Sequence, residues 1–186
     1  MELTLPNLFH NFLNLLSIGS SDHASLHVLV VHFPIALFFT APLFIVLGLT
    51  FERLSKAFYA ASLLLMGLGM LTLFLSISTG EAASETLNLL PDALETLEAH
   101  DRLNLQCRFV FSILTGIWAV YVLSFSRLNK VFSRKIHIVI LLSFLLIYSY
   151  GLLILLSAAH QGGKLVHHHG IKSKLFDRPA LSVTPQ

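Results

Sequence analysis

The sequence has few charged residues and a single cysteine. Asp, Glu, Lys and Arg make up 12% of its 186 residues, whereas soluble domains carry about 25%. Cys107 cannot form a disulfide within the chain or a CxxC pair for zinc, an iron–sulfur cluster or covalently attached haem. The net charge of +2 includes no basic block long enough to follow a nucleic-acid backbone. An ordinary soluble domain is excluded, and no nucleic-acid partner is expected.

Long apolar runs replace the missing charge, and hydrophobic residues account for 55% of the chain. A helix needs about 20 apolar residues to cross a bilayer. Four segments meet this requirement: residues 26–50, 57–78, 103–126 and 136–159. These runs are too continuous for spanning strands, which alternate polar and apolar residues. The sequence therefore predicts an all-α fold, a four-helix transmembrane bundle within residues 26–170.

The segments around the spans carry their own signals. Residues 1–25 lack an initial Lys or Arg, which favours a retained amphipathic helix at the membrane interface over a cleaved signal peptide. Pro34 predicts a bend in the first span, and Pro91 predicts the first turn of an extended third helix. Gly162 and Gly163 predict the end of the fourth helix, and residues 171–186 read as a polar tail.

The basic residues predict the orientation. Six of the twelve lie in the first and third connections, whereas the second connection is mainly acidic; the tail from Lys164 onward carries four more and argues against the orientation that the connections favour. Because Lys and Arg remain on the cytoplasmic side during insertion, both termini should lie on the outer side. The basic residues concerned are Arg53, Lys56, Arg127, Lys130, Arg134 and Lys135.

The histidines are distributed unevenly over this topology. All ten except His137 fall on the outer side. His32 lies inside the first span. His27, His100 and His160 lie close to the outer boundaries of the first, third and fourth spans, respectively. A histidine within a bilayer is costly unless its ring nitrogens have partners, which favours a functional role. The alternative is that these side chains serve as interhelical hydrogen bonds.

Haem is the ligand that this layer of imidazoles suits best. Haem iron accepts two axial imidazoles, and helix bundles hold the macrocycle between their helices. We predict one or two non-covalent haem b groups. Arg108, the only full charge within a span, is a candidate partner for a propionate. The predicted iron ligands, in order of preference, are His32, His100, His160, His27 and His169.

Copper or zinc is the alternative ligand. His23 and His27 have HxxxH spacing, and His167 to His169 supply HxH spacing. Motifs for hydrolytic or nucleotide chemistry, such as GxSxG, HExxH and the Walker loop, do not occur in the sequence. We therefore expect no hydrolytic or nucleotide-dependent activity.

Two segments resemble a known family. LHVLVVHFPIAL at residues 26–37 and QGGKLVHHHG at residues 161–170 are similar to the end motifs of a widespread family of bacterial four-span membrane proteins, formerly of unknown function. That family typically opens with a pattern like HPxxVHFPIAL and closes with one like GGxLVxxHG. Val28 stands where the family usually has proline, whereas Thr79–Gly80 and His100 also match. The resemblance implies a membrane location and association with c-type cytochromes and respiratory enzymes.

Together these observations predict a b-type cytochrome of the bacterial inner membrane. It would carry electrons between membrane quinol and a periplasmic redox partner, such as a cytochrome, through bis-histidine haem near the outer face. Its role would be that of an electron-transfer protein or a subunit of an oxidoreductase complex in the respiratory chain, and an oligomer is compatible with this role. The alternatives are a non-haem anchoring subunit of a respiratory complex and a membrane protein that handles copper or zinc.

Overall fold

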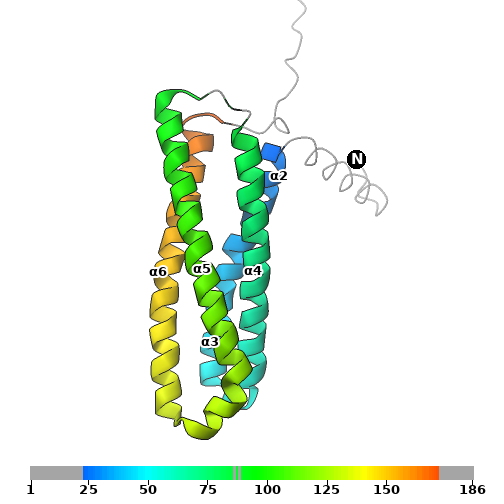
Figure 1. The fold of residues 1–186 in the computed structure, drawn as a ribbon, viewed down its shortest axis with the longest axis vertical. Coiled ribbons are helices and arrows are strands. Elements are labelled where there is room, and N and C mark those ends of the chain that lie inside the picture. Colours follow the sequence, from blue (N-terminus) through cyan, green and yellow to red (C-terminus); the bar gives the residue numbers. More distant parts are fainter. Residues whose placement is uncertain (1–22, 86, 88, 172–186) are drawn as a thin grey trace, which may run out of the picture.

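The computed structural model describes residues 23–85, 87 and 89–171, which form a bundle of long helices (Figure 1). No strand occurs among these residues, so the predicted all-α fold is confirmed. Four helical stretches are long and apolar enough to cross a membrane: His23–Thr50, Glu52–Ser84, Pro91–Val131 and Arg134–His167. The protein is therefore a multi-pass membrane protein. The elements are α2 (His23–Val30), α3 (His32–Thr50), η1 (Glu52–Leu54), α4 (Ser55–Ser84), α5 (Pro91–Val131) and α6 (Arg134–His167).

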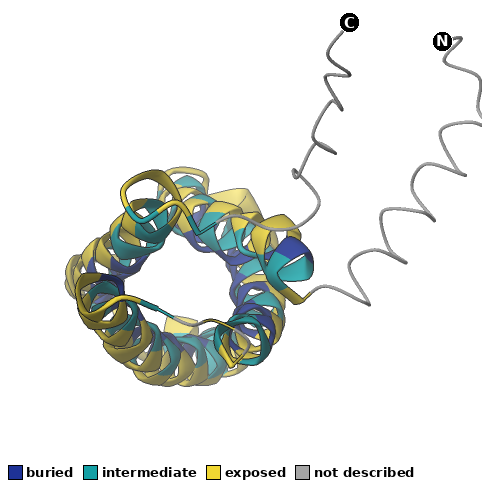
Figure 2. Ribbon diagram, turned by 90° about the horizontal axis from the view of Figure 1, so that it is seen from above, coloured by how far each residue is buried: buried dark blue, intermediate teal, exposed yellow. Residues whose placement is uncertain are grey.

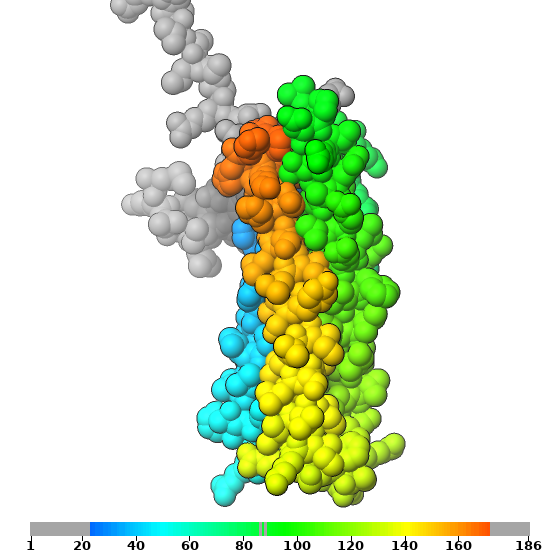
Figure 3. Space-filling model, turned by 90° about the vertical axis from the view of Figure 1, so that its left-hand side faces the viewer, coloured from blue at the N-terminus to red at the C-terminus, as the bar shows by residue number. Residues whose placement is uncertain are grey.

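The long helices run alternately up and down the bundle. α4 packs between α2–α3 and α5, while α6 packs against α5 and α3. Figure 3 shows α6 along the middle of one face, with α5 on one side of it and α2–α3 on the other. Seen from above in Figure 2, the buried residues face the common axis and the exposed residues face outward. Many of these exposed residues are large and apolar, as a surface in contact with lipid requires.

The two ends of the bundle differ. η1 and the connection between α5 and α6 lie at one end, which we call the basic end. There the ion pair between Arg134 and Glu52 joins α6 to η1 at 2.6 Å. The connection between α4 and α5 lies at the other end, together with α2 and the end of α6. We call it the histidine end, because every histidine in the described part of the chain except His137 lies in its half of the bundle.

Proline positions explain two helix boundaries. α2 and α3 are separated at Val31, one turn before Pro34. Because Pro34 has no amide hydrogen, the carbonyl of Val30 loses its usual helical donor, and the helical hydrogen-bond pattern is interrupted at Val31. Pro91 is the first residue of α5, which continues without interruption to Val131, so the extended third helix is confirmed.

One predicted boundary was wrong. Gly162 and Gly163 do not end the fourth helix, because α6 continues through both of them to His167. The turn that follows contains Gly170, whose φ of 69° is readily adopted only by glycine. The predicted interfacial helix at residues 1–25 lies outside the described residues except for 23–25, which belong to α2. The predicted tail at residues 171–186 lies outside them after Ile171.

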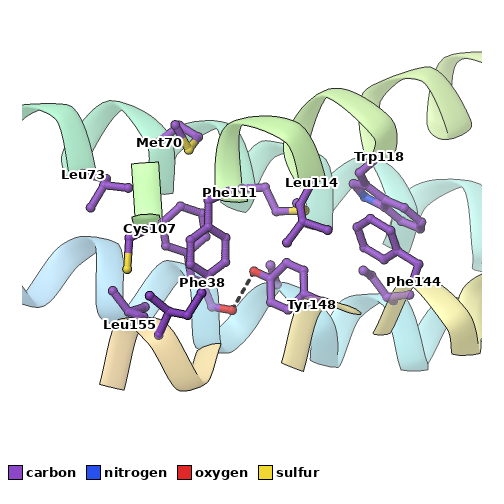
Figure 4. Close-up of a cluster of buried hydrophobic side chains, with 14 of the residues drawn as sticks. Phe38, Met70, Leu73, Cys107, Phe111, Leu114, Trp118, Phe144, Tyr148 and Leu155 are labelled. Atoms are coloured by element: carbon purple, nitrogen blue, oxygen red, sulfur yellow. Dashed lines mark hydrogen bonds between the residues drawn. The ribbon is translucent and has the colours of Figure 1, made fainter. Parts of the chain in front are cut away.

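Aromatic side chains fill the middle of the bundle (Figure 4). Phe38 of α3 stacks on Phe111 of α5 with ring centroids 3.9 Å apart. The hydroxyl of Tyr148 of α6 donates to the backbone carbonyl of Phe38 at 2.8 Å. That carbonyl is available because the residue one turn later is Pro42, which has no N–H to offer it. These contacts hold α3, α5 and α6 together and so set the relative positions of the helices that reach the histidine end.

The two helical hairpins, α2–α3 with α4 and α5 with α6, place their core residues at matching intervals. Equal spacing of core residues is common in helix bundles. It is informative here only at the histidine end, where the equivalent residues of the two hairpins make the same contacts. In the first helices the matching residues are His27, Pro34, Phe38, Ala41 and Ile45, against His100, Cys107, Phe111, Leu114 and Trp118. In the second they are Tyr59, Ser62, Met66, Gly69, Leu73 and Ser76, against Leu141, Phe144, Tyr148, Gly151, Leu155 and Ala158.

Candidate functional site

Two of the predicted histidines meet at the histidine end. His27 of α2 and His100 of α5 lie with their ring centroids 6.5 Å apart and their planes at 89°. His100 is buried, with 9% of its surface exposed, and His27 is partly buried. The two residues come from different hairpins. The folded bundle thus brings together side chains that are far apart in the sequence.

Each ring is held through its Nδ1 atom. Nδ1 of His27 lies 2.8 Å from the carbonyl oxygen of Ser76, and Nδ1 of His100 lies 2.8 Å from that of Ala158. A carbonyl oxygen only accepts hydrogen bonds, so both Nδ1 atoms must carry the proton. In the neutral rings each Nε2 then has a free lone pair. A histidine that binds a metal is usually held in this way, with its second nitrogen donating to a carbonyl or carboxylate.

A glycine lies beside each ring. A Cβ on Gly80 of α4 would come within 3.0 Å of Cε1 of His27, and one on Gly162 of α6 within 3.1 Å of Cε1 of His100. Both distances are tighter than ordinary carbon contacts of about 3.5–4.0 Å. The glycines therefore give the imidazoles the room that they occupy. Gly162 was predicted to end the fourth helix, and the structure instead places it inside α6, in contact with the His100 ring.

The two histidine environments match residue by residue. Each ring donates to a carbonyl on the second helix of its own hairpin and packs against the glycine one turn after that carbonyl: Ser76 with Gly80, and Ala158 with Gly162. The two hairpins thus present equivalent imidazoles from opposite sides. This equivalence suits a ligand with two similar faces.

A cavity of about 210 Å³ adjoins both rings. Its wall includes Gly80 and Gly162, and its exposed members Asp101 and Leu105 show that it reaches the surface beside α5. The remaining lining is mainly apolar, with the side chains of Glu81, Ser84 and Asn104 as further polar groups.

The other predicted site residues lie elsewhere. His32 is exposed at the beginning of α3, where its Nδ1 lies 2.9 Å from the carbonyl of Val28. His160 is also exposed. Nε2 of His169 lies 3.0 Å from the hydroxyl of Thr96, one turn of α5 before His100. His169 therefore neighbours the pair without joining it.

Arg108 lies in a separate groove rather than in the histidine cavity. The groove runs between α4 and α5 and is lined by Phe74, Leu105 and Phe109. Leu105 also lines the histidine cavity, so it separates the two spaces. Arg108 is thus placed beside the cavity, on the side where the cavity reaches the surface.

The spacing of the two imidazoles agrees with that of two ligands of one haem iron. With metal–nitrogen bonds of about 2 Å, imidazoles on opposite sides of one ion have centroids roughly 6 Å apart, close to the 6.5 Å between His27 and His100. In the described part of the chain, no group of three or more His, Cys, Asp or Glu side chains is placed to hold a metal ion. A cavity of about 210 Å³ is smaller than usual ligand pockets of about 300–1,000 Å³. It would therefore enclose only part of the macrocycle.

Comparison with known proteins gives a family but no described activity. The family model for predicted membrane proteins named DUF2231 matches residues 23–175, which includes all the described helices. No curated protein and no solved structure matches the sequence. The match covers most of the chain, and the chain belongs to the DUF2231 family of predicted membrane proteins.

Proposed function

We propose that this protein is a b-type membrane cytochrome in which His27 and His100 would hold one haem. The observation that carries the proposal is the equivalent placement of the two imidazoles, 6.5 Å apart, with both Nδ1 atoms bound to backbone carbonyls. Haem iron needs only two protein ligands because the macrocycle supplies four nitrogens. The macrocycle also has two similar faces, which agrees with the equivalent contacts of the two histidines.

The residues around the pair have separate roles in this proposal. Ser76 and Ala158 accept the Nδ1 protons, which fixes the tautomer and keeps both Nε2 lone pairs available. Gly80 and Gly162 allow the rings to lie close to α4 and α6. Arg108, beside the opening, supplies a positive charge for a carboxylate that leaves the cavity. When bound between two imidazoles, haem supplies one-electron transfer with no open coordination site.

We further propose that the histidine end faces the periplasm of a bacterial inner membrane, with both termini on that side. The basic residues at the opposite end support this orientation. A haem at the histidine end would then carry electrons between quinol in the bilayer and a periplasmic redox protein. The acidic residues Glu81, Glu85 and Glu98 at this end suit a basic partner.

The test is a reduced-minus-oxidised visible spectrum of the full chain, purified in detergent from a haem-replete host, with pyridine extraction to count haem. We expect a low-spin b-type spectrum and one haem per chain. His27→Ala and His100→Ala should each lower the haem affinity by at least about tenfold. A colourless wild-type protein would refute the proposal.

His32→Ala and His160→Ala are the matched controls, because both remove an imidazole that the structure places on the exposed surface. They should keep the wild-type spectrum and haem content. Loss of haem in His32→Ala with an unchanged His27→Ala variant would move the site to the ligand that the sequence favoured first.

A further inference from the structure

A second cavity lies at the basic end, far from the histidine pair. It measures about 230 Å³ and is bounded by the ends of all four long helices. Its wall includes Ser55 and Tyr59 of α4, Asn129 of α5, and Arg134 and His137 of α6. The ion pair between Arg134 and Glu52 lies at its rim. The proposed haem site makes no use of this cavity.

His137, in the wall of this cavity, has a ring nitrogen without a hydrogen-bond partner among the described residues. Only 6% of the residue is exposed, and its Nδ1 lies 2.9 Å from the hydroxyl of Tyr121. Its Nε2 is buried and has no hydrogen-bond partner in the described part of the protein. If Tyr121 donates to Nδ1, Nε2 carries a hydrogen with no acceptor. If Nδ1 donates, Nε2 of the neutral ring is an acceptor with no donor. Buried polar atoms in native proteins usually have partners, so Nε2 of His137 has a hydrogen-bonding capacity that the described residues leave unused.

The charges around this cavity favour an anion. The first turns of α4 and α6 contain no acidic residue and have no side-chain cap. Lys56, Arg134 and Lys135 occupy these turns instead. Positive charge at the positive end of a helix dipole is unfavourable unless an anion lies close by. Among the described residues of the η1 and α5–α6 connections, Glu52 is the single acidic side chain.

The hydrogen-bonding groups are also those that an anion needs. The hydroxyl groups of Ser55 and Tyr59 and the amide of Asn129 can all donate into the cavity. His137 becomes a donor through Nε2 when Tyr121 donates to its other nitrogen. Arg134 adds a guanidinium, whose planar donors match phosphate oxygens. The donors come from α4, α5 and α6, so a ligand with several acceptor oxygens would bind all three.

We propose that this cavity binds a phosphate group, provided by an anionic phospholipid or by a free phosphate ion. His137, Asn129 and Arg134 hold its oxygens. Glu52 competes for Arg134, but their ion pair is 61–64% exposed, and exposed pairs contribute little stability. The phosphate therefore replaces the Glu52 carboxylate on Arg134 at low cost. The site is independent of the haem proposal and holds whether or not haem binds at the other end.

The experiment is calorimetric titration of the full chain in a non-ionic detergent. The probes are dioctanoyl phosphatidylglycerol, inorganic phosphate, and dioctanoylglycerol as the matched lipid without phosphate. Saturable binding of either phosphate compound, without binding of dioctanoylglycerol, is expected. The phosphate compound that saturates at the lower concentration identifies the source of the group. Absence of saturable binding by both phosphate compounds would overturn the proposal.

Three variants test the location. Arg134→Gln should weaken binding by about tenfold or more, whereas Arg127→Gln, which removes the same charge outside the cavity wall, should change it less than about twofold. Glu52→Gln removes the competing carboxylate and should strengthen binding. His137→Phe should weaken it if the variant folds, and Glu52→Gln keeps the test decisive if it does not. Equal effects of Arg134→Gln and Arg127→Gln would show diffuse attraction to the basic end and overturn the proposal.

Discussion

Gly162 lies against the imidazole of His100, so that a Cβ at this position would come within 3.1 Å of Cε1. The same contact recurs between Gly80 and His27. Both glycines lie within helices, where glycine is less favourable than alanine by about 1 kcal/mol. The contact with the ring supplies a reason for glycine at each position.

The first prediction follows from this contact. Gly162→Ala should displace the His100 ring by a few tenths of an ångström, which would alter the low-spin spectrum and lower haem affinity by about tenfold. Gly163→Ala is the matched control, because nothing lies within 4 Å of the Cβ that it adds. Reduction potential and electron paramagnetic resonance of the haem-bound protein measure the effect. Identical spectra for the two variants would show that Gly162 does not position His100.

The second prediction concerns the hydrogen bond from Tyr148 to the carbonyl of Phe38. Tyr148→Phe keeps the ring and removes the donor, leaving a buried carbonyl without a partner. The free energy of unfolding should fall by about 1–3 kcal/mol. Denaturant titration in detergent measures this fall. Tyr150→Phe is the control, because Tyr150 is 63% exposed and should give no change.

A double variant separates this bond from general packing. If Pro42 is the reason that the carbonyl of Phe38 is free, Pro42→Ala restores a helical N–H one turn later. Tyr148→Phe should then cost less in the Pro42→Ala background than in the wild type. Equal costs in the two backgrounds would contradict the assigned relationship.

The third prediction concerns the end of α6. The bond between Thr96 and His169 ties this end to α5 at 3.0 Å. Thr96→Val should speed hydrogen exchange of the amides near Ile171 about as much as His169→Ala does, because either change removes one partner of the bond. Neither variant should lose haem. Loss of the low-spin spectrum in His169→Ala alone would restore His169 as the iron ligand that the sequence suggested.

The sequence predicts the fold well because apolar length and proline positions decide it. Long charge-free runs identify the spans, Pro34 marks the interruption between α2 and α3, and Pro91 marks a helix start. It predicts the site less well because pairing depends on which helices become neighbours. His27 and His100 were among the candidates, but their meeting follows from the rotation of α2 and α5. The equivalence of the two hairpins cannot be recognised in the sequence either, because the equivalent residues are mostly of different types.

The glycines show why local signals mislead here. Gly162 and Gly163 end helices in many proteins, and the sequence alone predicts such an end. In this bundle, however, α6 continues to His167, and Gly162 packs against the ring of His100 instead. The sequence gives no signal for a site at His137, because this residue lies apart from the other histidines. Only the structure shows that its Nε2 is buried and without a partner among the described residues.

The last prediction tests the orientation in the membrane. Leu54 of η1 at the basic end and Leu90 before α5 at the histidine end are 56% and 77% exposed. In a Cys107→Ser background, Leu90→Cys should react with a membrane-impermeant maleimide in cells with a permeabilised outer membrane, because the histidine end is expected to face the periplasm. Leu54→Cys should react only after the inner membrane is lysed, since Lys and Arg are expected to keep its connection in the cytoplasm. The reverse pattern would place the histidine pair beside the cytoplasm. The redox partner would then have to be a cytoplasmic protein, although the haem ligands would be unchanged.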